Sequence, residues 1–252
     1  MLALTREISS AIGGCQLTHL AREPIDLSLA RSQHRDYERA LESLGCTVRR
    51  LPADETMPDS VFIEDTTVVL PEVAVLARPG AQSRRLEVSA VAAALEPLRP
   101  LFHVESPGTL DGGDVLVIGR TIFVGRSTRT NDAGVEQLRA AVAPFGYAVD
   151  TVSTSGCLHL KSAVTAIDER TVLINPRWVS RQPFQEYRQI DSDPSEPGAA
   201  NVVSVGGQVI AAASFPRTCA HLEEQGVRVT RVDASELAKA EGALTCCSVL
   251  VS

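Results

Sequence analysis

The chain has 252 residues, of which 44% are apolar and 22% charged, a composition typical of a globular protein, and we expect residues 1–252 to form one domain. Its formal net charge of −7 argues against a nucleic-acid partner, because phosphates require a basic face, and suits a cationic small-molecule substrate. No apolar run approaches the roughly 20 residues of a membrane span, so we expect no membrane contact and a cytoplasmic location.

Short apolar runs joined by hairpin turns recur along the chain, and most are followed by an amphipathic helix. The turns contain the glycine, proline or acidic residues that favour hairpins. The predicted strand pairs cover residues 66–70 and 73–77, 114–118 and 121–124, 162–167 and 171–174, and 201–205 and 208–213. The predicted helices cover 83–98, 131–145 and 217–225, and residues 182–200 form a long connector over the surface.

These hairpins begin near residues 66, 114, 162 and 201, at intervals of 48, 48 and 39 residues. A repeat of roughly 40–50 residues is typical of a radial array. A fifth unit is split between the chain ends, with strands at 247–251 and 2–8 and a helix at 26–44. We therefore predict an α/β fold, a five-bladed pseudo-symmetric α/β propeller whose last unit is closed by the N- and C-terminal strands.

In such a ring, the residues just before the first strand of each unit converge near the axis. Those segments are 59–65, 111–114, 159–161 and Cys246, and they contain carboxylates, an imidazole and a thiol. This set predicts a cysteine nucleophile with a distant histidine and acidic partners. Cys246 and Cys247 are placed at the start of a strand, where successive side chains point to opposite faces, so one can be buried while the other faces a site.

The motifs that carry these residues resemble the dimethylarginine dimethylaminohydrolase family, in the pentein superfamily of guanidine-modifying enzymes. They occur in the family's order over essentially the whole chain, at residues 58–65, 78–85, 110–115, 125–131, 158–162 and 244–250. The resemblance implies the pentein fold and a hydrolase without cofactor or metal. The implied reaction converts asymmetric dimethylarginine or monomethylarginine to citrulline plus dimethylamine or methylamine.

The resemblance also implies three catalytic roles. The Cys246 thiolate would attack the central guanidinium carbon and form a covalent thiouronium-like intermediate. His159 would protonate the leaving amine and then activate water, as a general acid and base. Asp111 would be the acidic partner of His159, whereas Asp114 is either a second contact near the guanidinium or a structural acid.

Substrate contacts are implied in the same way. Paired carboxylates would grip the planar guanidinium, and an acid and two arginines would surround the amino-acid end. Arg85 competes with Arg84 for one of these positions, and the spacing from Asp65 favours Arg84. Two backbone carbonyls complete the set, and one lies in the segment 13–24, which is expected to act as a lid. The implied contacts are Leu17, Asp59, Phe62, Glu64, Asp65, Arg84, Arg129 and Ala240.

Other functions are possible for the same fold. An arginine deiminase or an amidinotransferase would share the cysteine, histidine and carboxylates, although those relatives usually carry extra segments. A non-catalytic ribosome-binding module of this fold would lack the cysteine and histidine. A zinc enzyme is disfavoured because only one histidine and one cysteine are expected at the site. Monomer and homodimer are both compatible with the sequence.

Overall fold

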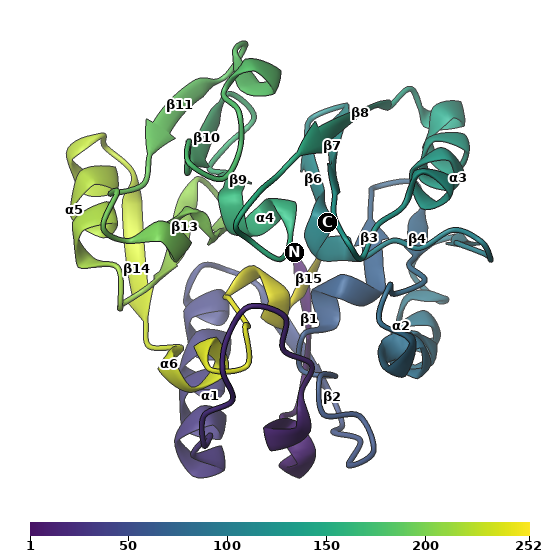
Figure 1. Cartoon of the computed structure of the whole chain (residues 1–252), viewed down its shortest axis with the longest axis horizontal. Helices are drawn as coiled ribbons and strands as arrows, with labels where there is room; N and C mark the ends of the chain where they lie inside the picture. Colours follow the sequence, from purple (N-terminus) through teal and green to yellow (C-terminus); the bar gives the residue numbers. More distant parts are fainter.

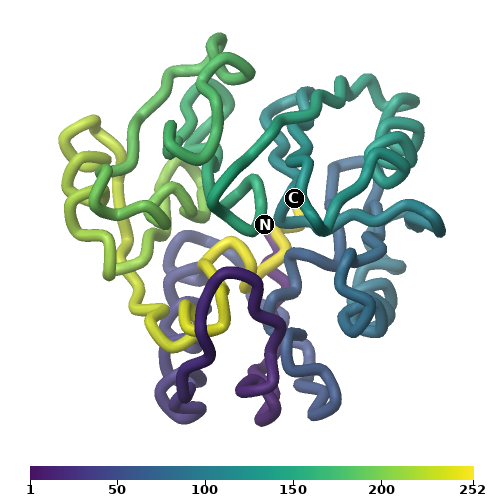
Figure 2. Tube along the Cα trace, in the orientation of Figure 1, coloured from purple at the N-terminus to yellow at the C-terminus, as the bar shows by residue number.

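The computed structural model describes all 252 residues, and its strands form five separate three-stranded sheets. Figures 1 and 2 show these sheets around one central axis, with the helices that connect the strands of a blade on the outer side of the ring. Each sheet with its connecting segments is one blade, so the predicted five-bladed α/β propeller is confirmed.

Every blade has the same strand order. The middle strand pairs antiparallel with the first strand and parallel with the third. A parallel neighbour requires a crossover connection, which a helix supplies in four blades. The blades are β3 (Thr67–Val69), β4 (Ala74–Leu76) and β5 (Leu101–His103); β6 (Val115–Ile118), β7 (Thr121–Arg126) and β8 (Ala148–Ser153); β9 (Val164–Ala166), β10 (Thr171–Ile174) and β11 (Arg188–Asp191); β12 (Val202–Val205), β13 (Gln208–Ala212) and β14 (Arg228–Val232); and β15 (Val249–Val251), β1 (Leu2–Arg6) and β2 (Thr47–Leu51).

The crossover helices follow the predicted amphipathic segments closely. Two begin with a side-chain cap, since Asp26 accepts the N–H of Leu29 and Asn131 accepts the N–H of Gly134. The first part of the predicted helix 83–98 is a 3₁₀ helix, η3 (Gln82–Glu87). The α-helices are α1 (Leu27–Ser43), α2 (Val88–Leu95), α3 (Asp132–Val142), the short α4 (Leu160–Ala163), α5 (Pro216–Glu224) and α6 (Ser235–Ala238).

The predicted surface connector at residues 182–200 is partly wrong. It contains β11, the third strand of its blade, and Phe184, which is fully buried. Strand β11 has a single fully buried apolar side chain, Ile190, so its sequence lacks the alternation that identifies a strand.

All five predicted first strands begin later than expected, because a short helical turn precedes the first strand of every blade. Cys246 and Cys247 therefore lie on a 3₁₀ turn rather than on a strand, although Cys247 is still buried and Cys246 only partly so. The turns contact one another near the axis and place their side chains there. They are η2 (Ile63–Thr66), η4 (Gly112–Asp114), α4, η7 (Pro197–Ala200) and η8 (Thr245–Cys247).

The two ends of the chain close the ring, as predicted. β1 pairs antiparallel with β15 and parallel with β2, and Figure 1 shows both termini near the centre. The buried apolar side chains pack mainly between neighbouring blades. For example, Leu4 and Val249 of the closing blade pack with Ile63 and Leu76 of the next one. None of the helices combines the length and apolar character needed to cross a membrane.

Candidate active site

A pocket lies at the axis, where the turns before the first strands meet. Eight of the eleven residues predicted to carry chemistry or contact substrate line this pocket, and Asp111 contacts it through His159. Leu17 and Glu64 do not line it. The lining residues are Gln16, Asp59, Phe62, Asp65, Arg84, Arg129, Leu158, His159, Ser162, Ala240, Glu241, Gly242 and Cys246.

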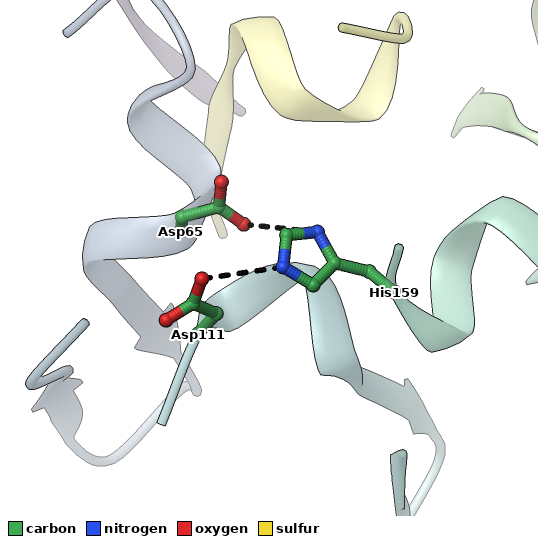
Figure 3. A group of neighbouring side chains, drawn as sticks. All are labelled: Asp65, Asp111 and His159. Atoms are coloured by element: carbon green, nitrogen blue, oxygen red, sulfur yellow. Dashed lines mark hydrogen bonds and ion pairs between the residues drawn. The ribbon is translucent and has the colours of Figure 1, made fainter. Parts of the chain in front are cut away.

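His159 stands between two carboxylates. Its Nε2 lies 3.2 Å from Oδ2 of Asp111, and its Nδ1 lies 3.6 Å from Oδ1 of Asp65, as Figure 3 shows. Burial alone would lower the pKa of His159, but Asp65, Asp114 and Asp111 together raise it to about 9. The imidazole is therefore protonated at neutral pH and can act as a general acid.

Backbone amides hold both carboxylates in place. The N–H of Gly80 donates to Oδ1 of Asp111 at 2.8 Å, and the N–H of Gly113 donates to Oδ1 of Asp65 at 3.0 Å. A Cβ atom at position 113 would lie 2.6 Å from Nδ1 of His159. Glycine is therefore required there for the histidine to reach its partners.

Arg84 is buried, and most of its N–H groups donate to other groups of the protein. Its Nη1 donates to Oδ2 of Asp65 at 2.5 Å, its Nε and Nη2 donate to Glu87, and Nη2 also donates to the carbonyl of Phe62 at 2.9 Å. Of its five N–H groups, only the second on Nη1 has no partner and could reach a ligand. Burial would raise the pKa of Asp65, but His159 and Arg84 lower it to about 2, so Asp65 is a fixed carboxylate.

The Cys246 thiol is neutral in this environment. Burial and the nearby carboxylates of Glu64 and Asp65 together raise its pKa to about 12. A cation bound beside the sulfur would offset both effects and favour the thiolate. The pocket therefore suits a positively charged ligand.

Glu64 lies outside this pocket, in contrast to the expected guanidinium contact. Its Oε1 pairs with Nζ of Lys161 at 2.6 Å, and its Oε2 accepts the hydroxyl of Thr245 at 2.8 Å. All three residues line a second cavity, whose walls come from the first strands of the five blades. Glu64 and Lys161 thus belong to the lining of that cavity and not to the pocket of Cys246.

Asp114 is fully buried and does not line the pocket. Its Oδ1 accepts the N–H of Leu160 at 3.1 Å, next to His159. Its Oδ2 accepts the hydroxyls of Ser127 at 2.6 Å and Thr130 at 2.7 Å, on either side of Arg129. Asp114 therefore ties together two segments that carry site residues, which favours the structural alternative for this acid.

Replacing Asp114 with asparagine is expected to impair stability and activity together. The amide offers only one acceptor oxygen, so at least one buried donor loses its partner, at a cost of about 1–3 kcal/mol. Turnover should fall about 10- to 100-fold, because both tied segments shift. Urea unfolding and turnover assays would check this, with the exposed Asp150→Asn as the control. Wild-type values for Asp114→Asn would contradict the assigned role.

The segment 13–24, predicted to act as a lid, reaches the pocket through Gln16, which lines it. The N–H of Gln16 donates to both carboxylate oxygens of Asp59, at 3.0 and 3.2 Å. Leu17, the predicted contact, is the next residue. Sequence reasoning missed Glu241, which lines the pocket and accepts lid N–H groups. Its one local signal is its place between Ala240, a predicted contact, and Gly242.

A metal ion could be held by three of the site residues. Ligand atoms of Asp65, Asp111 and His159 all lie within 4.8 Å of one another. This set of one imidazole and two carboxylates differs from the histidine and cysteine expected from the sequence. Both carboxylates already accept hydrogen bonds from the protein, so a metal would have to share them.

Comparisons with known proteins agree with this geometry. Residues 17–247 match the family described as N,N dimethylarginine dimethylhydrolase, eukaryotic. The dimethylarginine dimethylaminohydrolase of Streptomyces coelicolor is 43% identical over 98% of this chain and 95% of its own length. The Pseudomonas aeruginosa enzyme is 34% identical over 95% and 94%. A solved cysteine-to-serine mutant of that enzyme, complexed with citrulline, has a TM-score of 0.94 at 32% identity, covering 98% of this chain and 97% of the other.

Proposed function

Because the chain belongs to the dimethylarginine dimethylaminohydrolase family, we propose that it hydrolyses asymmetric dimethylarginine and monomethylarginine to citrulline, releasing dimethylamine or methylamine. The observation that carries this proposal is the pocket itself. It combines a thiol, a protonated imidazole and a fixed carboxylate, from Cys246, His159 and Asp65.

The first half of the reaction forms a covalent intermediate. The substrate guanidinium binds against the Asp65 carboxylate and favours loss of the Cys246 proton to solvent. The sulfur then attacks the guanidinium carbon. The bond from this carbon to the methylated nitrogen breaks as His159 gives that nitrogen a proton, and the amine leaves. Nδ1 of His159 suits this role, because its 3.6 Å separation from Asp65 is too long for a hydrogen bond.

The second half releases citrulline. His159, now neutral, takes a proton from water while the water oxygen attacks the same carbon. The carbon–sulfur bond breaks, Cys246 returns as the thiolate, and the second proton of the water leaves the new oxygen for solvent as the citrulline carbonyl forms. Asp111 holds Nε2 of His159 at 3.2 Å through both steps, so the ring keeps one orientation.

The amino-acid end of the substrate would lie under the lid. Asp59 would accept the α-ammonium group, and Arg129 together with the available N–H of Arg84 would donate to the α-carboxylate. Leu17 and Ala240 would offer backbone carbonyls, and Phe62 would contact the alkyl chain. Glu64 would act from outside the pocket, through its charge near Cys246 and its ion pair with Lys161.

Arg129→Ala should mainly raise KM, by about 10- to 100-fold, with a smaller change in kcat. Arg129 touches the part of the substrate that does not react, so its contact contributes to binding in ground and transition states alike. Steady-state citrulline assays would show this, with the exposed Arg228→Ala as the control. An unchanged KM would remove Arg129 from the substrate site.

The function is tested by citrulline release from asymmetric dimethylarginine, monomethylarginine and arginine, measured side by side. Turnover of the two methylated substrates alone supports the proposal. Turnover of arginine alone would indicate an arginine deiminase, and amidine transfer to an added amine would indicate an amidinotransferase. Failure of the folded protein with all three substrates would refute the proposed reaction.

We further propose a cytoplasmic enzyme that acts on its small-molecule substrate as a monomer or homodimer. All six cysteines are free thiols, a pattern usual in reducing compartments. The pocket forms within a single copy of the chain, so both states are compatible with the proposed reaction. Cell fractionation and analytical ultracentrifugation would test both points.

A further inference from the structure

The lid over the pocket is tied to the pocket rim at its start and near its end. At its start, Gln16 donates to Asp59, and near its end Nζ of Lys239 donates to the carbonyl of Pro24 at 3.2 Å. Figure 2 shows this segment, in dark purple, beside the yellow segment that contains Lys239. The cavity beneath has a volume of about 30 Å³, room for roughly two water molecules. This is too little room for a substrate the size of arginine, and an opening of the lid would supply more.

One carboxylate holds the middle of the lid. Glu241 accepts the backbone N–H of Thr18 at 2.9 Å, of His19 at 2.5 Å and of Leu20 at 2.6 Å. Three consecutive N–H groups that point at one anion form an anion-binding nest, and each hydrogen bond is strengthened by the charge. The lid tip therefore depends on this one side chain far more than on any other contact.

The backbone at this point is also unusual. Glu241 is the only residue other than glycine with a positive φ, 58°. This conformation costs about 1–2 kcal/mol for an L-residue and is kept only where surrounding contacts enforce it. The next residue, Gly242, packs so tightly that a Cβ atom would lie 2.1 Å from the Phe62 ring. The turn is thus fixed against the pocket wall and directs the Glu241 side chain to the lid.

Two of the other lid contacts use groups that the substrate needs. Asp59 bonds Gln16 of the lid, and Nη2 of Arg129 donates to the hydroxyl of Thr18 at 3.2 Å. When the α-ammonium and α-carboxylate groups of a substrate take Asp59 and Arg129, these contacts weaken. Glu241 has no such second task, so its contacts to the lid tip persist in the complex.

We propose that Glu241 is a positioning residue, which latches the lid and holds the backbone carbonyl of Leu17 over the amino-acid end of the substrate. Leu17 lies between Gln16, whose N–H donates to Asp59, and Thr18, whose N–H donates to Glu241. The substrate weakens the contact to Asp59 but not the contact to Glu241. Glu241 therefore keeps the Leu17 carbonyl in place when substrate is bound. This inference rests on the proposed function, since it assigns the lid to a methylarginine.

Glu241→Gln is the variant that tests the latch. The neutral amide keeps the size of the side chain but loses the charge and one acceptor oxygen, so the bonds to the three N–H groups weaken. We expect KM to rise about 10-fold or more, while kcat changes by less than about 3-fold. Hydrogen exchange of the amides of residues 18–20 in the free protein should accelerate about 10-fold or more, with exchange of the blade strands unchanged.

Two further variants sharpen the result. Glu241→Asp keeps the charge on a shorter side chain and should show an intermediate KM and intermediate exchange. Glu186→Gln, at an exposed position, should match wild type in both. Accelerated exchange throughout the protein with an unchanged KM would indicate a merely structural role and overturn the proposal. Unchanged exchange at residues 18–20, or a loss confined to kcat, would overturn it as well.

The exchange measurement needs no turnover, so it separates the latch from the function. If wild type released no citrulline, the proposed function would fail, while the exchange data would still show whether Glu241 holds the lid tip. If wild type were active and Glu241→Gln kept both a normal KM and normal lid exchange, the latch alone would fail.

Discussion

Cys246→Ser is expected to lower citrulline formation by about 10,000-fold or more without unfolding the protein. The serine hydroxyl is far less acidic than the thiol, whose pKa is already raised to about 12, so a bound cation cannot generate the nucleophile. Citrulline assays with asymmetric dimethylarginine would measure the loss. Mass spectrometry of the acid-quenched wild type should show the covalent adduct, and the variant should show none.

The neighbouring thiol provides a matched control. Cys247 lies outside the pocket, is 1% exposed, and places its Sγ 3.4 Å from the carbonyl of Ala243. In Cys247→Ser, the new hydroxyl can donate to the same carbonyl, so turnover should stay within about 5-fold of wild type. Normal turnover by Cys246→Ser would exclude this residue as the nucleophile.

His159→Ala should lower turnover by about 1,000- to 10,000-fold, because the leaving amine has no proton donor and the attacking water has no base. The folded structure should persist, but three carboxylates lose the cation between them. His103→Ala, at an exposed position on β5, is the control and should keep normal activity. Substantial citrulline production by His159→Ala would rule out the proposed acid–base role.

The pH dependence of stability provides a second check on His159. Its pKa is raised from 6.5 to about 9 in the folded protein, so the folded state binds this proton more tightly than the unfolded state does. The resulting stabilisation is fully present below pH 6.5 and is lost as the pH rises through 9. The difference in unfolding free energy between wild type and His159→Ala should therefore shrink over this range. A constant difference between pH 6 and pH 10 would contradict the raised pKa.

The sequence predicted the inner part of each blade better than the outer part. First and middle strands such as β6 and β7 are rich in buried apolar residues and joined by clear turns, so their pattern is readable. The third strands were missed in all five blades. In β2 and β14, the arginines are exposed and only the last residue of each strand is buried, because these strands lie at the outer edge of their sheets. The crossover connection brings each third strand beside its middle strand, and no local sequence pattern marks the third strand.

The candidate site could also be predicted only in part from the sequence. Residues such as His159 and Cys246 could be predicted, because they stand in motifs just before first strands. The contacts of Arg84 and Glu64 could not, since they depend on side chains of other segments, Asp65 and Lys161. Glu241 was missed for the same reason, because its partners are backbone N–H groups more than 200 residues away in the chain.

The separate origin of the catalytic groups has a consequence for how such a ring can change over evolutionary time. The thiol, the imidazole and the carboxylates each come from the inner turn of a different blade, while the sheets only set their spacing. One turn can therefore acquire a new side chain without disturbing the other roles. A ring of five identical repeats would present five identical groups and no directed chemistry. The asymmetry needed for a reaction is thus concentrated in a few inner-turn positions, which can diverge one at a time on an unchanged scaffold.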